Sequence, residues 1–301
     1  MKTKMIAVLT AILALHISAA EKVWFPGGKN VNISDAGNWV GSVAPEEGDD
    51  LIITNNVSSN VTWDISFAVA DVFLNNAKLT ISKTLLANNL VASNGTMKLN
   101  DGVTAKNIKF GGTGTVTMGK YPICADENCV IGGSVKITHS GPVQFPTAKV
   151  EIIVGGDLIV ESTASINVDK IGQGSTDWQD KHFRGFVYNT SSGTGGGGWY
   201  GGVATGCTSI MQPYGNIYSP CDYGRRSVAM NGNISYGGGK VIIQAGGGVI
   251  LDGKISSCGG GSASSSDNYA TGSGGSIDIT AASFSGAGSV NASGKDPANN
   301  Y

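Results

Sequence analysis

The sequence predicts an all-β fold, a single-stranded parallel β-solenoid that carries a long glycine- and aromatic-rich loop insertion. Three observations support this prediction. Apolar-x-apolar triplets begin at Leu79, Met97, Val116 and Val135, at intervals of 18, 19 and 19 residues. Glycine and asparagine turns separate the triplets, and 46 glycines accompany only 14% charged residues. Triplets in fixed phase indicate a chain whose successive turns stack equivalent strands.

Residues 1–20 have the three parts of a secretory signal. Lys2 and Lys4 form the positive start, Met5 to Leu15 the apolar middle, and Ser18 to Ala20 the small residues before the cleavage point. We therefore expect cleavage after Ala20 and a secreted protein, extracellular or on a cell surface. The apolar run is short for a bilayer span, so we expect no transmembrane segment in the mature chain.

The charge of the mature chain excludes one class of partner. Loss of Lys2 and Lys4 reduces the basic residues from 20 to 18, against 22 acidic residues, for a net charge of −4. Nucleic acid binding calls for a basic face, so we expect no nucleic acid partner. A hydrophobic content of 41% in regular alternation indicates a folded chain with a narrow core rather than disorder.

Composition divides the mature chain into four parts. Residues 21–60 are expected to form an N-terminal capping segment and 61–171 the first coils. The alternation stops in residues 172–236, which we interpret as the glycine- and aromatic-rich insertion. Residues 237–301 resume the coils without a visible cap, as in a fragment of a longer protein, and contain two matching units 36 residues apart.

The capping segment contains Trp24, the pair Asn38-Trp39 and the turn Pro45-Glu46-Glu47-Gly48-Asp49. The two tryptophans would cover the apolar end of the first coil, and a sugar-stacking site is the alternative. With these motifs the segment resembles the start of bacterial surface and autotransporter-like β-helix proteins. Gly155 to Gly294 is similar to glycine-rich β-helix segments of large secreted bacterial proteins. These resemblances imply a right-handed β-helix and bring no catalytic residue with them.

Five cysteines remain after cleavage, and an exported protein can keep disulfides. We expect Cys124 to bridge Cys129 and pin an extruded loop, and Cys207 to bridge Cys221, which leaves Cys258 over. A metal site at the first pair is the alternative, but a second pair of ligands is missing. We therefore predict no metal and no cofactor.

Three lysines occupy the middle position of apolar-x-apolar triplets: Lys98, Lys109 and Lys136. Their side chains are expected to point outward, opposite to their apolar neighbours. They would keep the sheet face hydrated; a stripe that binds acidic glycans is the alternative.

The function predicted from these features is non-catalytic and adhesin-like, because no nucleophile motif or paired acid site is evident. Flat aromatic rings stack on sugars, so the insertion would contact a polysaccharide or cell-surface glycan, unless its rings only pack it onto the coils. The candidate contacts are Trp199, Tyr200, Tyr214, Tyr218 and Tyr223. The alternative function is a β-helix polysaccharide lyase or glycoside hydrolase, with charged candidates Asp177, Asp180, Lys181, Arg184, Asp222, Arg225 and Arg226.

Overall fold

The computed structural model confirms the predicted all-β fold. It describes residues 20–54, 60–141, 147–172, 216, 218–228, 234–261 and 271–295. Within these ranges the one helical element is a 3-10 turn, η1 (Ala36–Asn38). Seventeen strands form one large sheet in which every strand pair is parallel, and two further strands form a separate antiparallel pair.

Most strands fall into two groups on either side of the insertion. Before it lie β1 (Glu21–Val23), β2 (Asp50–Thr54), β3 (Val61–Trp63), β4 (Val69–Asn75), β5 (Lys78–Ile81), β6 (Leu85–Leu99), β7 (Val103–Met118), β8 (Ile123–Ala125), β9 (Cys129–Ile131), β10 (Ser134–His139), β11 (Val150–Val154), β12 (Leu158–Val160) and β13 (Ser165–Asn167). Two short strands lie within the insertion, β14 (Ser227–Val228) and β15 (Ile234–Ser235). After it lie β16 (Lys240–Leu251), β17 (Lys254–Ser256), β18 (Ser276–Ser285) and β19 (Ser289–Asn291).

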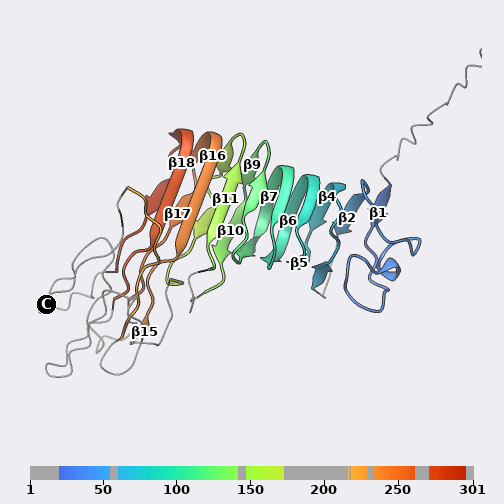
Figure 1. The fold of residues 1–301 in the computed structure, drawn as a ribbon, viewed down its shortest axis with the longest axis horizontal. Coiled ribbons are helices and arrows are strands. Elements are labelled where there is room, and N and C mark those ends of the chain that lie inside the picture. Colours follow the sequence, from blue (N-terminus) through green and yellow to red (C-terminus); the bar gives the residue numbers. More distant parts are fainter. Residues whose placement is uncertain are drawn as a thin grey trace, which may run out of the picture.

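Strands pair with equivalent strands one pass further along the chain. Leu79 lies opposite Met97, which lies opposite Val116, as the 18- and 19-residue intervals predict. Figure 1 shows the strands stacked along the long axis of the molecule, from β1 at one end to β18 at the other. The predicted parallel stacking of successive passes is therefore present.

The predicted register is wrong after Val116. This residue pairs with Ile137 and not with Val135, because the next pass is two residues longer than the last. The spacing also predicts that the next triplet, Leu158-Ile159-Val160, 23 residues after Val135, continues this series. Instead, Leu158 pairs with Cys129 in the column that contains Ile108. Extra residues at the corners shift the phase, and sequence spacing alone cannot show which corner holds them.

The core consists of columns of inward side chains, one from each pass. Every residue of one such column is at most 1% exposed: Leu51, Val72, Leu90, Ile108, Cys129, Leu158 and Val249. Burial of an aliphatic side chain of this size stabilises a fold by roughly 1.5–3 kcal/mol. Stacking therefore extends one narrow apolar core along the whole sheet.

The corners repeat as regularly as the strands. Positive φ angles of 56°, 52°, 64° and 59° occur at Asn76, Asn94, Gly112 and Gly133 in successive passes. Asparagine and glycine adopt this left-handed backbone more readily than other residues. Three of the glycine and asparagine turns that separate the triplets, Asn94-Gly95, Gly111-Gly112 and Gly132-Gly133, each contain one such residue.

A ladder of side-chain amides and carboxylates, absent from the sequence prediction, runs beside the Leu90 column. The Asn89 amide donates to Asp71 Oδ1 at 2.8 Å, and the Asn107 amide donates to Asn89 Oδ1 at 3.3 Å. Further along, Asn128 Oδ1 accepts from the Asp157 N–H at 3.0 Å. Each pass is thus tied to the next by polar side chains as well as by the backbone.

The tryptophans of the N-terminal segment are buried. Trp24 and Trp39 are 5% and 2% exposed and contact each other edge to face, with ring centroids 5.3 Å apart. Asn38 fixes the loop between them, because its amide donates to the Asn30 and Asn32 carbonyls. Rings packed in this way have no free face for a sugar, so the stacking alternative at Trp24 and Trp39 is not supported.

A glycine-rich lobe follows the regular coils. We use this name for Gly172, Gly224, Gly237–Gly239, Gly259–Gly260 and Gly272–Gly275. Their backbones hydrogen-bond directly to one another: the Gly172 N–H donates to Gly237 and the Gly224 N–H to Gly238, each at 2.8 Å. An added Cβ at most of these positions would collide with a neighbouring carbonyl. The lobe is therefore packed by main chain where the coils are packed by side chains.

Candidate functional site

The described part of the insertion presents one exposed aromatic ring on an anchored segment, residues 218–228. Tyr218 is 91% exposed. Its backbone N–H donates to Asn216 Oδ1 at 2.8 Å, a local turn that fixes the chain at this point. The predicted ligand contact at Tyr218 is thus sterically open to a partner.

Tyr223 has a different role from the one predicted for it. It is only 8% exposed, and its hydroxyl donates to the Ala148 carbonyl at 2.6 Å. Burial raises the pKa of Tyr223 to about 12. Its ring also meets His139 edge to face, with centroids 6.1 Å apart. With ring and hydroxyl both engaged, Tyr223 anchors the segment and offers no face to a glycan.

Three further contacts hold the same segment on the sheet. The Ser276 hydroxyl donates to the Asp222 carbonyl at 2.8 Å. The Arg225 N–H donates to the Ser273 hydroxyl at 2.8 Å, and the Ser273 N–H donates back to the Arg225 carbonyl at 3.1 Å. Tyr218 therefore lies five residues from Tyr223, which is firmly anchored. The sequence did not distinguish these two residues from the other three aromatic candidates.

The remaining aromatic candidates, Trp199, Tyr200 and Tyr214, lie outside the described residues. The same holds for most of the charged candidates of the enzyme alternative: Asp177, Asp180, Lys181 and Arg184. Of the others, Arg225 is 6% exposed, and Asp222 and Arg226 are half-buried. The described residues therefore do not assemble the paired acid site that hydrolysis of a glycoside requires.

The predicted bridge between Cys124 and Cys129 is absent, because both are free thiols. Cys124 is the middle residue of β8 and half-buried, whereas Cys129 begins β9 and is fully buried in the core. The two thiols point to opposite faces of the sheet, and no loop is extruded between them. Burial raises the pKa of Cys129 to about 12. The thiol therefore stays protonated and packs as a small apolar side chain.

The second predicted bridge falls partly outside the described residues, since Cys207 is not among them; Cys221 is an exposed free thiol. The leftover Cys258 is half-buried, and its N–H donates to Asp169 Oδ1 at 2.6 Å. In the part of the chain that the structure describes, no three His, Cys, Asp or Glu residues lie close enough to hold a metal ion.

The outward direction of the three lysines is confirmed, since Lys98, Lys109 and Lys136 are all exposed. They do not form a stripe. Lys98 lies between Thr80 and Thr117, and Lys136 lies opposite Thr115 in another column. Lys109 belongs to a different face of the coil. The acidic-glycan alternative therefore has no aligned charges to support it.

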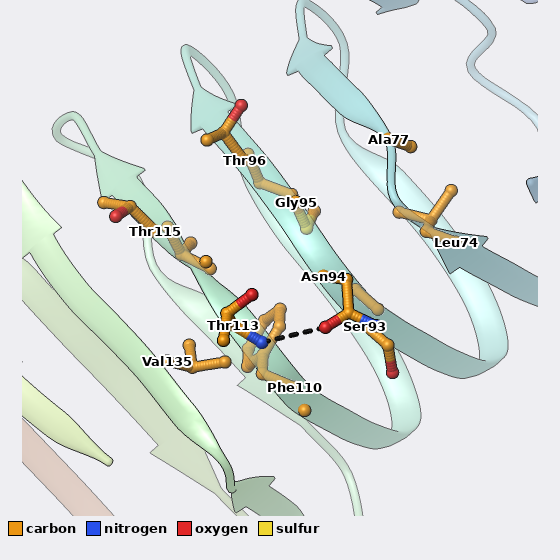
Figure 2. A pocket seen from close by; sticks show the side chains of 15 residues that line it. Leu74, Ala77, Ser93, Asn94, Gly95, Thr96, Phe110, Thr113, Thr115 and Val135 are labelled. Carbon is orange, nitrogen blue, oxygen red and sulfur yellow. Dashed lines mark hydrogen bonds between the residues drawn. The ribbon is translucent and has the colours of Figure 1, made fainter. Parts of the chain in front are cut away.

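A hollow at the corners of β6 and β7 is too small for a ligand. Phe110 and Val135 line it, together with Asn94 and Thr113, whose N–H donates to Asn94 Oδ1 (Figure 2). Its volume is about 20 Å³, room for one or two water molecules at roughly 10–15 Å³ each. Gly95 and Gly114 line it, so it arises where the corner residues lack side chains.

Comparison of the chain with protein-family models, with curated proteins and with solved structures found no match. A search of the described residues for a helix with the length and apolarity of a membrane span found none. The site residues must therefore be interpreted from their own geometry, and the exposed ring of Tyr218 on its anchored segment is the feature that this geometry singles out.

Proposed function

We propose that this protein is a secreted or cell-surface right-handed parallel β-helix without catalytic activity, which displays Tyr218 for contact with a glycan. The observation that carries this proposal is the contrast between Tyr218, 91% exposed, and Tyr223, 8% exposed, on one short segment. An exposed aromatic ring is costly to hydrate and well suited to stack on the apolar face of a sugar. The secretory signal predicted in residues 1–20 places such a ring where extracellular glycans occur.

Anchoring favours binding because it reduces the entropy lost when a ligand is engaged. The Tyr223 hydroxyl and the Ser276 hydroxyl already hold the segment on the sheet. A ring five residues from such an anchor samples fewer positions than a ring in a free tail. The rigid stack of coils then acts as a support that holds the contact away from the N-terminal end.

The test is a glycan array and a pull-down on insoluble polysaccharides with the purified mature protein. Loss of one stacking ring removes about 0.5–1.5 kcal/mol, so Tyr218→Ala should weaken binding roughly three- to tenfold. Tyr121→Ala is the matched control, because Tyr121 is 37% exposed and pairs instead with Lys120 Nζ, 4.7 Å from its ring centroid. Absence of glycan binding, or equal binding by the two variants, would contradict the proposal.

A further inference from the structure

His139 is a buried histidine at the junction between the first coils and the chain that returns after the insertion. It ends β10 and is 2% exposed. Two later segments close over it. Tyr223, from the anchored segment, meets its ring edge to face, and the Lys240 N–H at the start of β16 donates to Nε2 at 3.3 Å.

The hydrogen bonds of His139 fix the position of its single ring proton. Nδ1 lies 2.9 Å from the Ser140 carbonyl oxygen, which can only accept, so Nδ1 carries the hydrogen. Nε2 accepts from the Lys240 N–H and must be unprotonated. The neutral ring satisfies both partners, whereas a second proton on Nε2 would point at the Lys240 hydrogen.

The packing leaves the ring no other position. Gly239 lies directly against it, and a Cβ added there would collide with Nε2. Tyr223 contacts the ring from the anchored segment, and its phenol is neutral, with a pKa that burial raises further to about 12. A protonated ring could therefore be accommodated only if the anchored segment or the start of β16 moved.

The charged groups on the surrounding elements do not favour a second proton. The anchored segment carries Asp222, Arg225 and Arg226, and β16 begins with Lys240. On β11 and the residue before it, Glu151 is already paired with Lys149 at 2.7 Å. The charges on these elements are of both signs, so burial, and not a charged neighbour, disfavours a second proton on His139.

We propose that His139 is a pH-operated latch, which holds residues 218–228 and the start of β16 against β10 when neutral and releases them when protonated. Burial lowers the pKa of His139, and its hydrogen bond to the Ser140 carbonyl opposes that shift only in part. In the released state the His139 ring has an ordinary pKa near 6.5, so it binds a proton more readily than it does in the closed state. The latch is therefore fully held above about pH 6.5, and the open fraction rises by up to about tenfold per pH unit below it. This inference does not depend on the proposed glycan contact.

The experiment is hydrogen–deuterium exchange of the whole chain at pH 7.5 and pH 5.5, corrected for the intrinsic pH dependence of exchange. Peptides covering 218–228 and 236–245 should lose up to about tenfold in protection at pH 5.5, and a peptide from β6 should not change. His139→Gln is the matched variant. Its amide can accept from the Lys240 N–H and donate to the Ser140 carbonyl without titrating, so its protection should be equal at both pH values.

Unchanged protection of the wild-type peptides, or a pH response retained in His139→Gln, would overturn the latch. A second measurement needs no stable variant at position 139. NMR titration of the ring in the intact chain, with His182→Gln to assign the signals, should give a pKa for His139 below 6.5. A value at or above 6.5 would also overturn the proposal, because the closed form would then not disfavour the proton.

Discussion

The coils and the glycine-rich lobe solve the same packing problem in opposite ways. In the coils, aliphatic side chains stacked in inward columns exclude water, as in the column that begins with Leu51 and ends with Val249. The backbones of successive passes hydrogen-bond only along their strand edges. In the lobe, short extended segments approach closely because they lack side chains. Gly238, for example, accepts from the Gly224 N–H and donates to the Ser273 carbonyl.

This difference determines what each region tolerates. A side-chain core loses stability when atoms are removed, because a cavity is left behind. A main-chain core loses stability when atoms are added, because the backbone has nowhere to move. The coils should therefore be sensitive to truncation and the lobe to enlargement, and matched variants can test this.

The largest effect should come from truncation in the coils. Leu90 is completely buried and lies between Val72 and Ile108 in the central column. Leu90→Ala removes buried methyl groups from all of these contacts and should cost about 3 kcal/mol in free energy of unfolding. Leu86→Ala is the control, because Leu86 faces outward and is half-buried. Urea unfolding should separate the two variants by at least about 1.5 kcal/mol; equal losses would mean that the column is not the core.

Enlargement in the lobe should rank second. A Cβ at Gly238 would collide with the Ser257 carbonyl, which is held in place by a hydrogen bond from the Gly275 N–H. Gly238→Ala should cost about 2–3 kcal/mol. In Gly102→Ala the nearest heavy atom to the new methyl group lies 3.7 Å away, so the free energy of unfolding should change by less than about 0.5 kcal/mol. A small loss in free energy of unfolding for Gly238→Ala, similar to that of Gly102→Ala, would show that the lobe is loosely packed.

Sequence reasoning found the coils more readily than the lobe for the same physical reason. Alternation of apolar and polar residues reports a side-chain core, so Leu79, Met97 and Val116 were predicted in register. The lobe has no alternation to interpret. Its one spacing signal, the 36-residue interval, is confirmed by Lys240 opposite Ser276. The contacts of Gly172 and Gly224 join segments far apart in the chain, and composition alone cannot pair them.

The site was less predictable than the fold. Tyr218 and Tyr223 are the same residue type five positions apart. Only the contacts of Tyr223 with Ala148 and His139 show that Tyr223 anchors the segment while Tyr218 is exposed. Cys129-Val130-Ile131 fits the apolar-x-apolar pattern, which predicts a core position for Cys129. Cysteine commonly acts as a small apolar core residue, and spacing to Cys124 was given too much weight.

The two cysteines of the coils give a third test. Cys129→Ser places a hydroxyl in a fully apolar column and should cost about 1–3 kcal/mol. Cys124→Ser changes an outward, half-buried position and should cost less than about 0.5 kcal/mol. Thiol labelling at pH 8 provides an independent check. Cys129, with a pKa of about 12, should react only on unfolding, and rapid labelling of the native protein at this residue would contradict its burial.

The smallest effect should come from a corner, where main chain and side chain both contribute. Asn94 has a φ of 52°, its amide donates to Asn75 Oδ1 at 3.1 Å, and its Oδ1 accepts from the Thr113 N–H at 3.1 Å. Asn94→Gly keeps the left-handed backbone and loses the two bonds, whereas Asn94→Ala loses both features. We expect costs of about 0.5 kcal/mol for glycine and about 1–1.5 kcal/mol for alanine, measured by urea unfolding. Equal costs would show that the side-chain bonds and not the backbone angle select asparagine at this corner, and the stacked corners would then resemble the polar ladder more than the glycine lobe.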